Sequence, residues 1–296
     1  MGKYQVIQTV VFPMGDNGGN PCPVVLNGDF LTSGEMQEIA KELGHETCFV
    51  TKSHQDACEF RFRYFVPNFE MEMCVHATIG SVTVLVKKGL VRKSPLMIET
   101  LLGPITLNWE TTNDEIEVEV TQFLPKINEN VPTIAEICEA LNVKTHDLVG
   151  ESIQSISTSR FKLIIPLTSP DVLHKLKPDY KKIWKLCDHY SITGFYPFAI
   201  EDETHKVIQA RQFPNKAGYN EDPATGVAAS ALGAYLYLHD TFPKTETGLS
   251  TYHIKQGAAM GKPSYIEAKI YSENGIIQQT SIKGKAIIKE TSGIEH

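Results

Sequence analysis

An acidic pair directly precedes an Ala-rich segment in NEDPATGVAASALGAYL, residues 220–236, and the Ala-rich segment predicts a helix. Thr225 and Gly226 should lie in or just before its first turn, where Pro223 is also expected because the first turn needs no backbone N–H from it. Free N–H groups at a helix N-terminus bind anions, and glycine lets a ligand approach the backbone. Asp222 would lie beside this anion site, although an aspartate here is equally typical of a plain N-cap.

Three other residues have types that suit proton transfer or ligand binding. His76 begins a predicted helix, whose dipole favours the neutral imidazole, so the ring can donate or accept a hydrogen bond. Glu46 opens an apolar strand, where partial desolvation of the carboxylate favours its protonated form and suits acid–base work. Asn20 lies in a Gly-rich loop and could present its amide to a ligand. Taken singly, each residue also fits a structural role in a turn or helix start.

The elements that must position these residues form two similar series. The stretch 64–86 and the stretch 211–236 each contain a strand, then Pro-Asn, then an acidic loop, then a helix of small residues. Such a repeat predicts an α+β fold with two pseudo-symmetric halves. In each half, a curved, mostly antiparallel sheet should wrap around the central helix.

Prolines mark the expected boundary between the halves. Pro125 and Pro132 interrupt the strand pattern, so we expect an N-terminal half over residues 1–122 and a C-terminal half over 123–280. The last strands, about 280–296, are expected to return to the first half. Two helices have clear start signals, with Thr32 and Glu35 as a capping box for one and Thr133 as the cap of the other.

The composition is that of a soluble globular protein and narrows the possible functions. The net charge of -7 over 296 residues argues against nucleic acid as the main partner. Six scattered cysteines without CxxC spacing indicate reduced thiols rather than a zinc site. No nucleotide-binding glycine motif, hydrolase elbow, signal peptide or membrane span is found. We therefore expect a cytoplasmic protein that needs no metal or cofactor and does not bind membranes.

Five motifs follow one another along the chain, namely GNPCPVVL, EMQEIAKELGHETCFV, RYFVPNFEMEMCVHAT, RQFPN with EDPATGVAAS, and KQGAAMGKPS. Together they resemble the PhzF family, named for phenazine biosynthesis. The resemblance extends from Val10 to about Lys285. It implies the diaminopimelate epimerase-like fold, an active site in the cleft between the two halves, a small carboxylate substrate and a homodimer. The best-known family reaction isomerises trans-2,3-dihydro-3-hydroxyanthranilate without a cofactor.

The family motifs also imply roles for individual residues. Glu46 matches the acid/base of the Glu-Thr-x-Phe-Val motif, while His76 and Asp222 match residues that orient the substrate and assist proton movement. The residues implied to line the substrate are Asn20, Val75, Ala77, Thr225, Gly226 and Val227.

Two departures from the family pattern concern the substrate. The family usually has glycine where this chain has Val75, and serine where it has Val227. Valine disfavours a positive φ that glycine would allow, and Val227 removes a hydroxyl donor. We therefore expect proton-transfer chemistry on a compound other than the phenazine precursor.

Two alternatives remain open at this stage. One is an amino-acid epimerase or racemase of the same fold, which would use two cysteines on opposite sides of the substrate. Cys74 matches the first of these positions, but the second falls near Thr225, which has no thiol. The other alternative is a catalytically silent protein that binds a small anion, for which a nearby Glu46 would bring no advantage.

Overall fold

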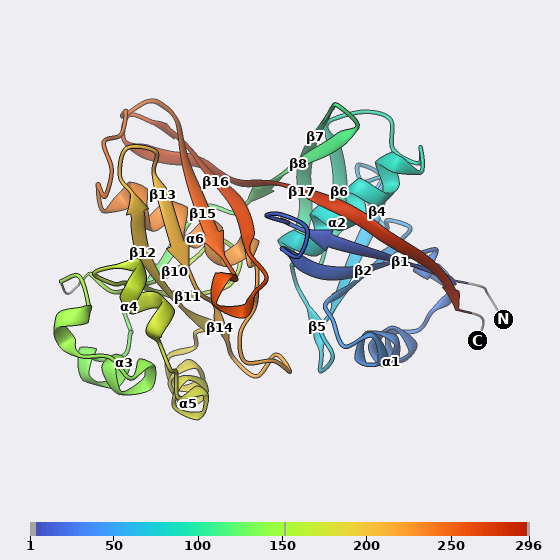
Figure 1. Ribbon diagram of the computed structural model, residues 1–296. Helices are drawn as coiled ribbons and strands as arrows, with labels where there is room; N and C mark the ends of the chain where they lie inside the picture. The colour runs from blue at the N-terminus through green and yellow to red at the C-terminus, as the bar shows by residue number, and fades with distance from the viewer. Residues whose placement is uncertain (1–3, 151, 295–296) are drawn as a thin grey trace. The chain divides into compact units, whose positions relative to one another are not determined.

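The computed structural model describes residues 4–150 and 152–294. The chain divides into two compact units. The first unit contains the residues up to Thr121 and those from Lys283 onward, and the second contains Gln122–Ile282. Each unit is built around one buried helix, α2 (Val75–Lys87) in the first and α6 (Gly226–Leu238) in the second (Figure 1).

The strands of the first unit form a closed ring. They are β1 (Tyr4–Val11), β2 (Asn20–Leu26), β3 (Thr47–Thr51), β4 (Phe60–Phe65), β5 (Glu70–Met71), β6 (Leu96–Thr100), β7 (Gly103–Thr112), β8 (Glu115–Gln122) and β17 (Ile276–Ile294). The pairing runs from β1 through β2, β3, β4, β6, β7 and β8 to β17, which pairs back with β1. The resulting strand barrel encloses α2.

The second unit repeats the order of strand directions. Its strands are β9 (Lys126–Asn128), β10 (Gln154–Ser157), β11 (Lys162–Pro166), β12 (Gly194–Asp202), β13 (Val207–Ala210), β14 (Phe213–Pro214), β15 (Gly248–Gln256) and β16 (Ser264–Glu273). From β10 to β16 the successive pairings are antiparallel, parallel, antiparallel, parallel and antiparallel, which is also the order from β1 to β7. The predicted α+β fold with two pseudo-symmetric parts is confirmed.

The remaining helices pack on the outside of the sheets. They are α1 (Ser33–Leu43), α3 (Ile134–Leu141), α4 (Pro170–Lys175) and α5 (Tyr180–Tyr190), with short 3-10 turns at Gly28–Phe30, Thr145–Asp147 and Ala258–Met260. The predicted capping box of α1 forms between Thr32 and Glu35, and Thr133 caps α3 as predicted and also forms a capping box with Glu136. Among the described residues, no helix combines the length and apolarity that crossing a bilayer requires.

Small residues let the strands approach both buried helices closely. A Cβ atom added to Gly80 would lie 2.7 Å from Thr9 Oγ1, and one added to Gly233 would lie 3.0 Å from Ala268 Cβ. Thr9 cannot give way freely, because its buried hydroxyl donates to Cys22 O at 2.6 Å. The helix axes are therefore fixed by contact with the surrounding strands.

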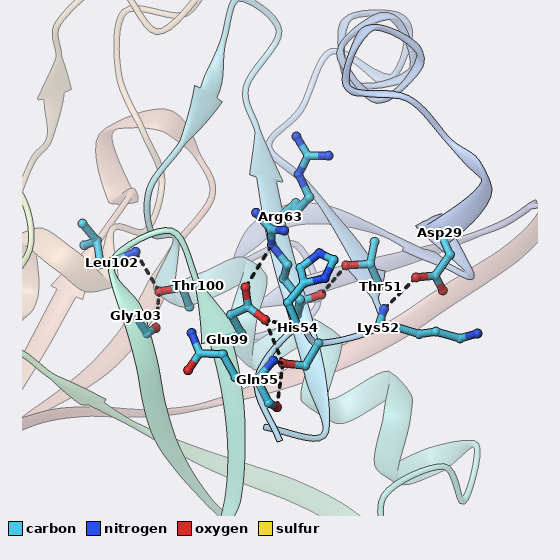
Figure 2. Close-up of polar contacts among 12 residues, drawn as sticks. Asp29, Thr51, Lys52, His54, Gln55, Arg63, Glu99, Thr100, Leu102 and Gly103 are labelled. Atoms are coloured by element: carbon cyan, nitrogen blue, oxygen red, sulfur yellow. Dashed lines mark hydrogen bonds and ion pairs between the residues drawn. The ribbon is translucent and has the colours of Figure 1, made fainter. Parts of the chain in front are cut away.

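A buried carboxylate anchors the loop that follows β3. Glu99 of β6 accepts a hydrogen bond from His54 N at 2.7 Å (Figure 2). It also accepts one from Ser53 Oγ at 2.7 Å, and its second oxygen lies 3.6 Å from Arg61 Nε. Burial alone raises the pKa of Glu99, but these hydrogen bonds and Arg61 outweigh it and hold the pKa below its ordinary value. The network fixes the C-terminal end of β3, the strand that Glu46 precedes.

We predict that Gly80→Ala lowers the free energy of unfolding by about 1–3 kcal/mol, because the new methyl group overpacks the contact with Thr9. The matched control is Gly34→Ala in α1, where a Cβ meets only Thr32 Oγ1 at 4.0 Å. The control should leave stability unchanged or raise it by up to ~1 kcal/mol. Urea unfolding of both variants measures this, and equal stabilities would contradict the close helix–strand contact.

Candidate active site

Glu46, Cys74 and His76 meet in the first unit, and we call them the Glu46 cluster. Glu46 lies directly before β3, after α1 has ended at Gly44, which adopts a left-handed conformation with φ of 66°. Cys74 is the N-cap of α2, and His76 is the second residue of that helix. The N-terminus of one helix and the start of one strand therefore bring together residues that are far apart in the sequence.

The three side chains contact one another directly. His76 Nε2 lies 2.9 Å from Glu46 Oε2. The Cys74 thiol donates to the same carboxylate oxygen, with Sγ 3.3 Å away, and Sγ is also 3.3 Å from His76 Nδ1. The side chain of Glu46 is 12% exposed and that of His76 is 4% exposed. Of these two side chains, Glu46 is thus the more accessible to a ligand.

The Cys74 thiol is protonated at neutral pH. Burial, followed by the charge of Glu46 and the neighbouring Cys22, raises its pKa well above the ordinary value, although a hydrogen bond from the Ala77 N–H works in the opposite direction. A protonated thiol is a hydrogen-bond donor to the carboxylate rather than a base. Ala77, expected to line the substrate, is the third residue of α2 and is buried.

The other sequence-predicted residues of the first unit lie at the starts of α2 and β2. Val75 is the first residue of α2 and is 2% exposed. It has no positive φ, so the backbone here does not require the glycine that the family pattern has. Asn20 begins β2, is 7% exposed and pairs with Val11 across the sheet.

Asp222 and Thr225 form a second cluster, in the second unit. Thr225 is the N-cap of α6, and its hydroxyl donates a short hydrogen bond to Asp222 Oδ2 rather than capping its own helix. Asp222 is therefore not the N-cap of α6, so the alternative that this aspartate only caps the helix is excluded. The prediction that Pro223 lies in the first turn is wrong, because α6 begins three residues later, at Gly226.

Gln256 holds this second cluster in place. Its Nε2 donates to the backbone oxygen of Asp222 at 2.6 Å and to Thr225 Oγ1 at 3.2 Å, while its Oε1 accepts from the Tyr196 hydroxyl at 2.9 Å. The next residue, Gly257, has φ of 79°, and a Cβ there would lie 2.7 Å from Pro223 O. Gln256 and Gly257 of the KQG motif thus contact the backbone of the Asp222 loop and hold it in place.

Glu221, the acidic residue that precedes Asp222 in the chain, has a structural role. Glu221 forms a bidentate ion pair with Arg211, with both N–O distances 2.8 Å. The same guanidinium donates to the carbonyl oxygens of Leu173 and Leu176. Glu221 therefore ties the loop to α4, and only Asp222 is positioned beside the helix N-terminus.

Thr225 and Gly226 lie at the start of α6, as predicted, and Val227 is the second residue of the helix. Both are buried, and Val227 is 6% exposed. The first N–H groups of a helix have no partner within the helix, so this turn and the corresponding turn of α2 can each bind an anion.

Two residues of these clusters were missed as site residues by sequence reasoning. Cys74 was considered only as a possible epimerase thiol, although its position two residues before His76 could have indicated the shared contact. Whether Gln256 contacts a ligand was left open, and nothing local in the sequence predicts its contact with Asp222. Among the described residues, ligand atoms of Glu46, Cys74 and His76 lie within 4.8 Å of one another. These three side chains do not fit one metal ion, because the buried Cys74 is a protonated thiol and its Sγ lies nearer His76 Nδ1 than Nε2.

Comparisons with known proteins agree with this architecture. An uncharacterised isomerase of Clostridium acetobutylicum is 31% identical, and the alignment covers 97% of this chain and 96% of the relative. The crystal structure of a PhzF-family phenazine biosynthesis protein from Bacillus anthracis superimposes with a TM-score of 0.86 at 27% identity, with full coverage of both chains.

A more distant structure shares the fold alone. A probable proline racemase of Agrobacterium radiobacter K84 matches with a TM-score of 0.71 at 12% identity, covering 99% of this chain and 93% of the racemase. The family model described as phenazine biosynthesis-like protein matches residues 11–292 of this chain. The chain therefore belongs to the PhzF family of phenazine biosynthesis-like proteins.

Proposed function

We propose that this protein is an isomerase that shifts a double bond in a small carboxylate-bearing substrate by moving a proton between two carbons, without a cofactor. Glu46 is the general acid and base. It takes the proton from one carbon and returns it to another on the same face of the substrate.

One observation carries this proposal, namely the arrangement of donors around a partly exposed carboxylate. Glu46 Oε2 contacts the Cys74 thiol and His76 Nε2, and neither neighbour is a fixed cation such as Lys or Arg. The thiol and the imidazole are groups that can donate a hydrogen bond to the carboxylate, and a carboxylate in such contacts can cycle between its two forms. This cycling is what a group that both removes and returns a proton requires.

The helix N-termini supply the electrostatic part of the mechanism. When a proton leaves carbon, negative charge develops on the substrate, and free N–H groups with the positive end of a helix dipole lower the cost of that charge. We assign this role to the first turn of α2, the helix that carries His76. Asp222, whose carboxylate accepts from Thr225, orients a donor group of the substrate, as the family motif implies.

The substrate is proposed to differ from the phenazine precursor. Val227 places an apolar side chain where the family pattern has a hydroxyl donor. A missing donor weakens binding of a polar group by about 1–3 kcal/mol. We therefore expect a small carboxylic acid that has less need of this donor, and slow turnover of trans-2,3-dihydro-3-hydroxyanthranilate.

The epimerase alternative fits the residues less well. Cys74 and Thr225 are the N-caps of α2 and α6 and so occupy equivalent positions in the two units. A two-thiol mechanism needs an activated thiol at both positions. Thr225 offers a hydroxyl instead, and the raised pKa of Cys74 leaves little thiolate at neutral pH to remove a proton.

The proposal is tested by adding the wild-type protein to a panel of small cyclic and aliphatic carboxylic acids in D2O, with carbon-bound protons followed by NMR. Deuterium uptake or a double-bond shift should appear with at least one compound. Glu46→Gln should lower the rate ~100-fold or more, because the amide cannot carry the proton. Glu42→Gln, an exposed carboxylate on α1, is the matched control and should keep the wild-type rate.

Two results would contradict the proposal. If Cys74→Ser abolished turnover while Glu46→Gln did not, the chemistry would be that of a thiol-dependent epimerase. If a carboxylic acid bound tightly and equally to wild type and Glu46→Gln, with no exchange in either, the protein would be a binding module without catalysis.

Thiol labelling gives an independent prediction. Cys138 on α3 is half-buried, whereas Cys74 is buried. Because the pKa of Cys74 is raised, little of the Cys74 side chain is thiolate at neutral pH. Iodoacetamide at pH 8 should therefore label Cys138 ~10-fold faster or more, as followed by mass spectrometry of peptides. Labelling of Cys74 should increase as the pH rises, since deprotonation is then favoured. Equal rates at pH 8 would indicate an activated thiol and favour the epimerase.

For Asp222→Asn we predict that kcat/KM falls about 10–100-fold on any compound that the wild type turns over, because a charged acceptor is lost while the side-chain shape remains. The melting temperature should stay close to that of the wild type. Asp171→Asn, an exposed carboxylate on α4 of the same unit, is the control. Unchanged kinetics in Asp222→Asn would remove this residue from the site.

A further inference from the structure

We propose that Tyr196 is a positioning residue that acts on Asp222 through Gln256 and Thr225. The four side chains form a series of hydrogen bonds that ends at the Asp222 carboxylate, and we call them the Tyr196 relay. Its consequence for turnover rests on the proposed function, whereas the hydrogen bonds themselves can be tested without a substrate.

Two backbone groups determine how the Gln256 amide is oriented. The Thr225 N–H needs an acceptor, so the Gln256 atom 3.3 Å from it is the carbonyl oxygen Oε1. The Asp222 backbone oxygen needs a donor, so the Gln256 atom 2.6 Å from it is Nε2. The reverse orientation would place two donors together and two acceptors together, so the chemistry of the neighbours excludes it.

This orientation determines the direction of the remaining hydrogen bonds. The Tyr196 hydroxyl lies 2.9 Å from Gln256 Oε1 and must donate to it. Gln256 Nε2 donates its second proton to Thr225 Oγ1 at 3.2 Å, and the Thr225 hydroxyl donates its only proton to Asp222 Oδ2. All three bonds run in one direction, so they polarise one another and make Asp222 the final acceptor.

The first two members of the relay lie on the sheet of the second unit. Tyr196 is on β12, which pairs with β11, and Gln256 is the last residue of β15, which pairs with β13 and β16. The two residues are 0% and 1% exposed. Asp222 and Thr225 instead lie in the segment before α6. Because groups on strands are held more precisely than groups on loops, the relay fixes the Asp222 carboxylate relative to the sheet.

Tyr196 remains a donor under ordinary conditions. Burial, followed by the negative charge of Asp222, raises the pKa of Tyr196 above its ordinary value. The phenol therefore keeps its proton at neutral pH, and the direction of the relay does not change.

Tyr196→Phe removes the hydroxyl and leaves Gln256 Oε1 with the Thr225 N–H. The variant should fold, but Asp222 should be held less precisely, so kcat/KM should fall about 10-fold on a compound that the wild type turns over. Tyr235→Phe on α6 is the matched control. Tyr235 is 3% exposed, and its hydroxyl donates to Ser152 O at 2.8 Å, outside the relay. This control loses the same atom and a hydrogen bond, yet should keep the wild-type kcat/KM.

A double-mutant cycle separates positioning from general stability. Gln256→Met keeps the side-chain length but removes the amide, so the relay is already broken in this background. Tyr196→Phe should then change kcat/KM by less than about 2-fold. An equal loss in the wild-type and Gln256→Met backgrounds would show that Tyr196 acts independently of Gln256 and would overturn the proposal.

Hydrogen exchange gives a readout that needs no substrate. NMR should find the side-chain amide protons of Gln256 and the Thr225 N–H exchanging ~10-fold faster or more in Tyr196→Phe than in the wild type. Tyr235→Phe should leave these rates unchanged. Unchanged rates in Tyr196→Phe would overturn the relay.

Failure of the isomerase proposal is distinguishable from failure of the relay. If no compound of the panel is turned over but the exchange rates change as expected, the relay is supported and the isomerase is lost. Turnover that depends on Glu46, together with unchanged exchange rates in Tyr196→Phe, has the opposite meaning.

Discussion

Close packing of strands around α2 and α6 is the constraint on which the rest of the structure depends. A helix enclosed by strands at contact distance must present small residues, and Gly80 and Gly233 meet that need. Such a helix has little freedom to slide or rotate, so its N-terminus is a fixed point. In the first unit this fixed point carries Cys74 and His76 to the start of β3, where Glu46 lies.

The same packing explains why the chemistry is located at helix starts. The residues of α2 from Val75 to Leu85 are buried within the barrel, whereas the first N–H groups of a helix have no partner within the helix. Side chains placed there are partly desolvated and lie in the field of the dipole. Glu46 combines this environment with contacts to the Cys74 thiol and the His76 ring, and the proposed acid–base role rests on these contacts.

Local features of the site and fold could be predicted from sequence, and long-range contacts could not. The capping boxes at Thr32 and Thr133 depend on residues three apart, and both are present. The start of α6 was misplaced at Pro223, because the hydrogen bond between Thr225 and Asp222 continues the loop up to Gly226. Helix α4 was missed because six residues give too little periodicity to recognise.

The candidate site illustrates the same limit. Glu46, His76 and Asp222 were named from their residue types and local positions and then matched to family motifs, but their spacing in the chain does not reveal that Glu46 contacts His76. The thiol between them acts as a donor because burial keeps it protonated, and burial is a property of the folded barrel. The support that Gln256 gives to Asp222 likewise comes from a strand 34 residues away in sequence.

A label-transfer experiment tests the central claim, a single carboxyl group acting on one face of the substrate, most directly. A compound that the protein turns over is prepared with deuterium at the carbon that loses its proton, and is converted in ordinary water. NMR of the product should find a measurable share of the deuterium at the accepting carbon, because Glu46 carries it there. Complete loss of the label to water together with inversion at the donor carbon would indicate two groups on opposite faces and contradict the account.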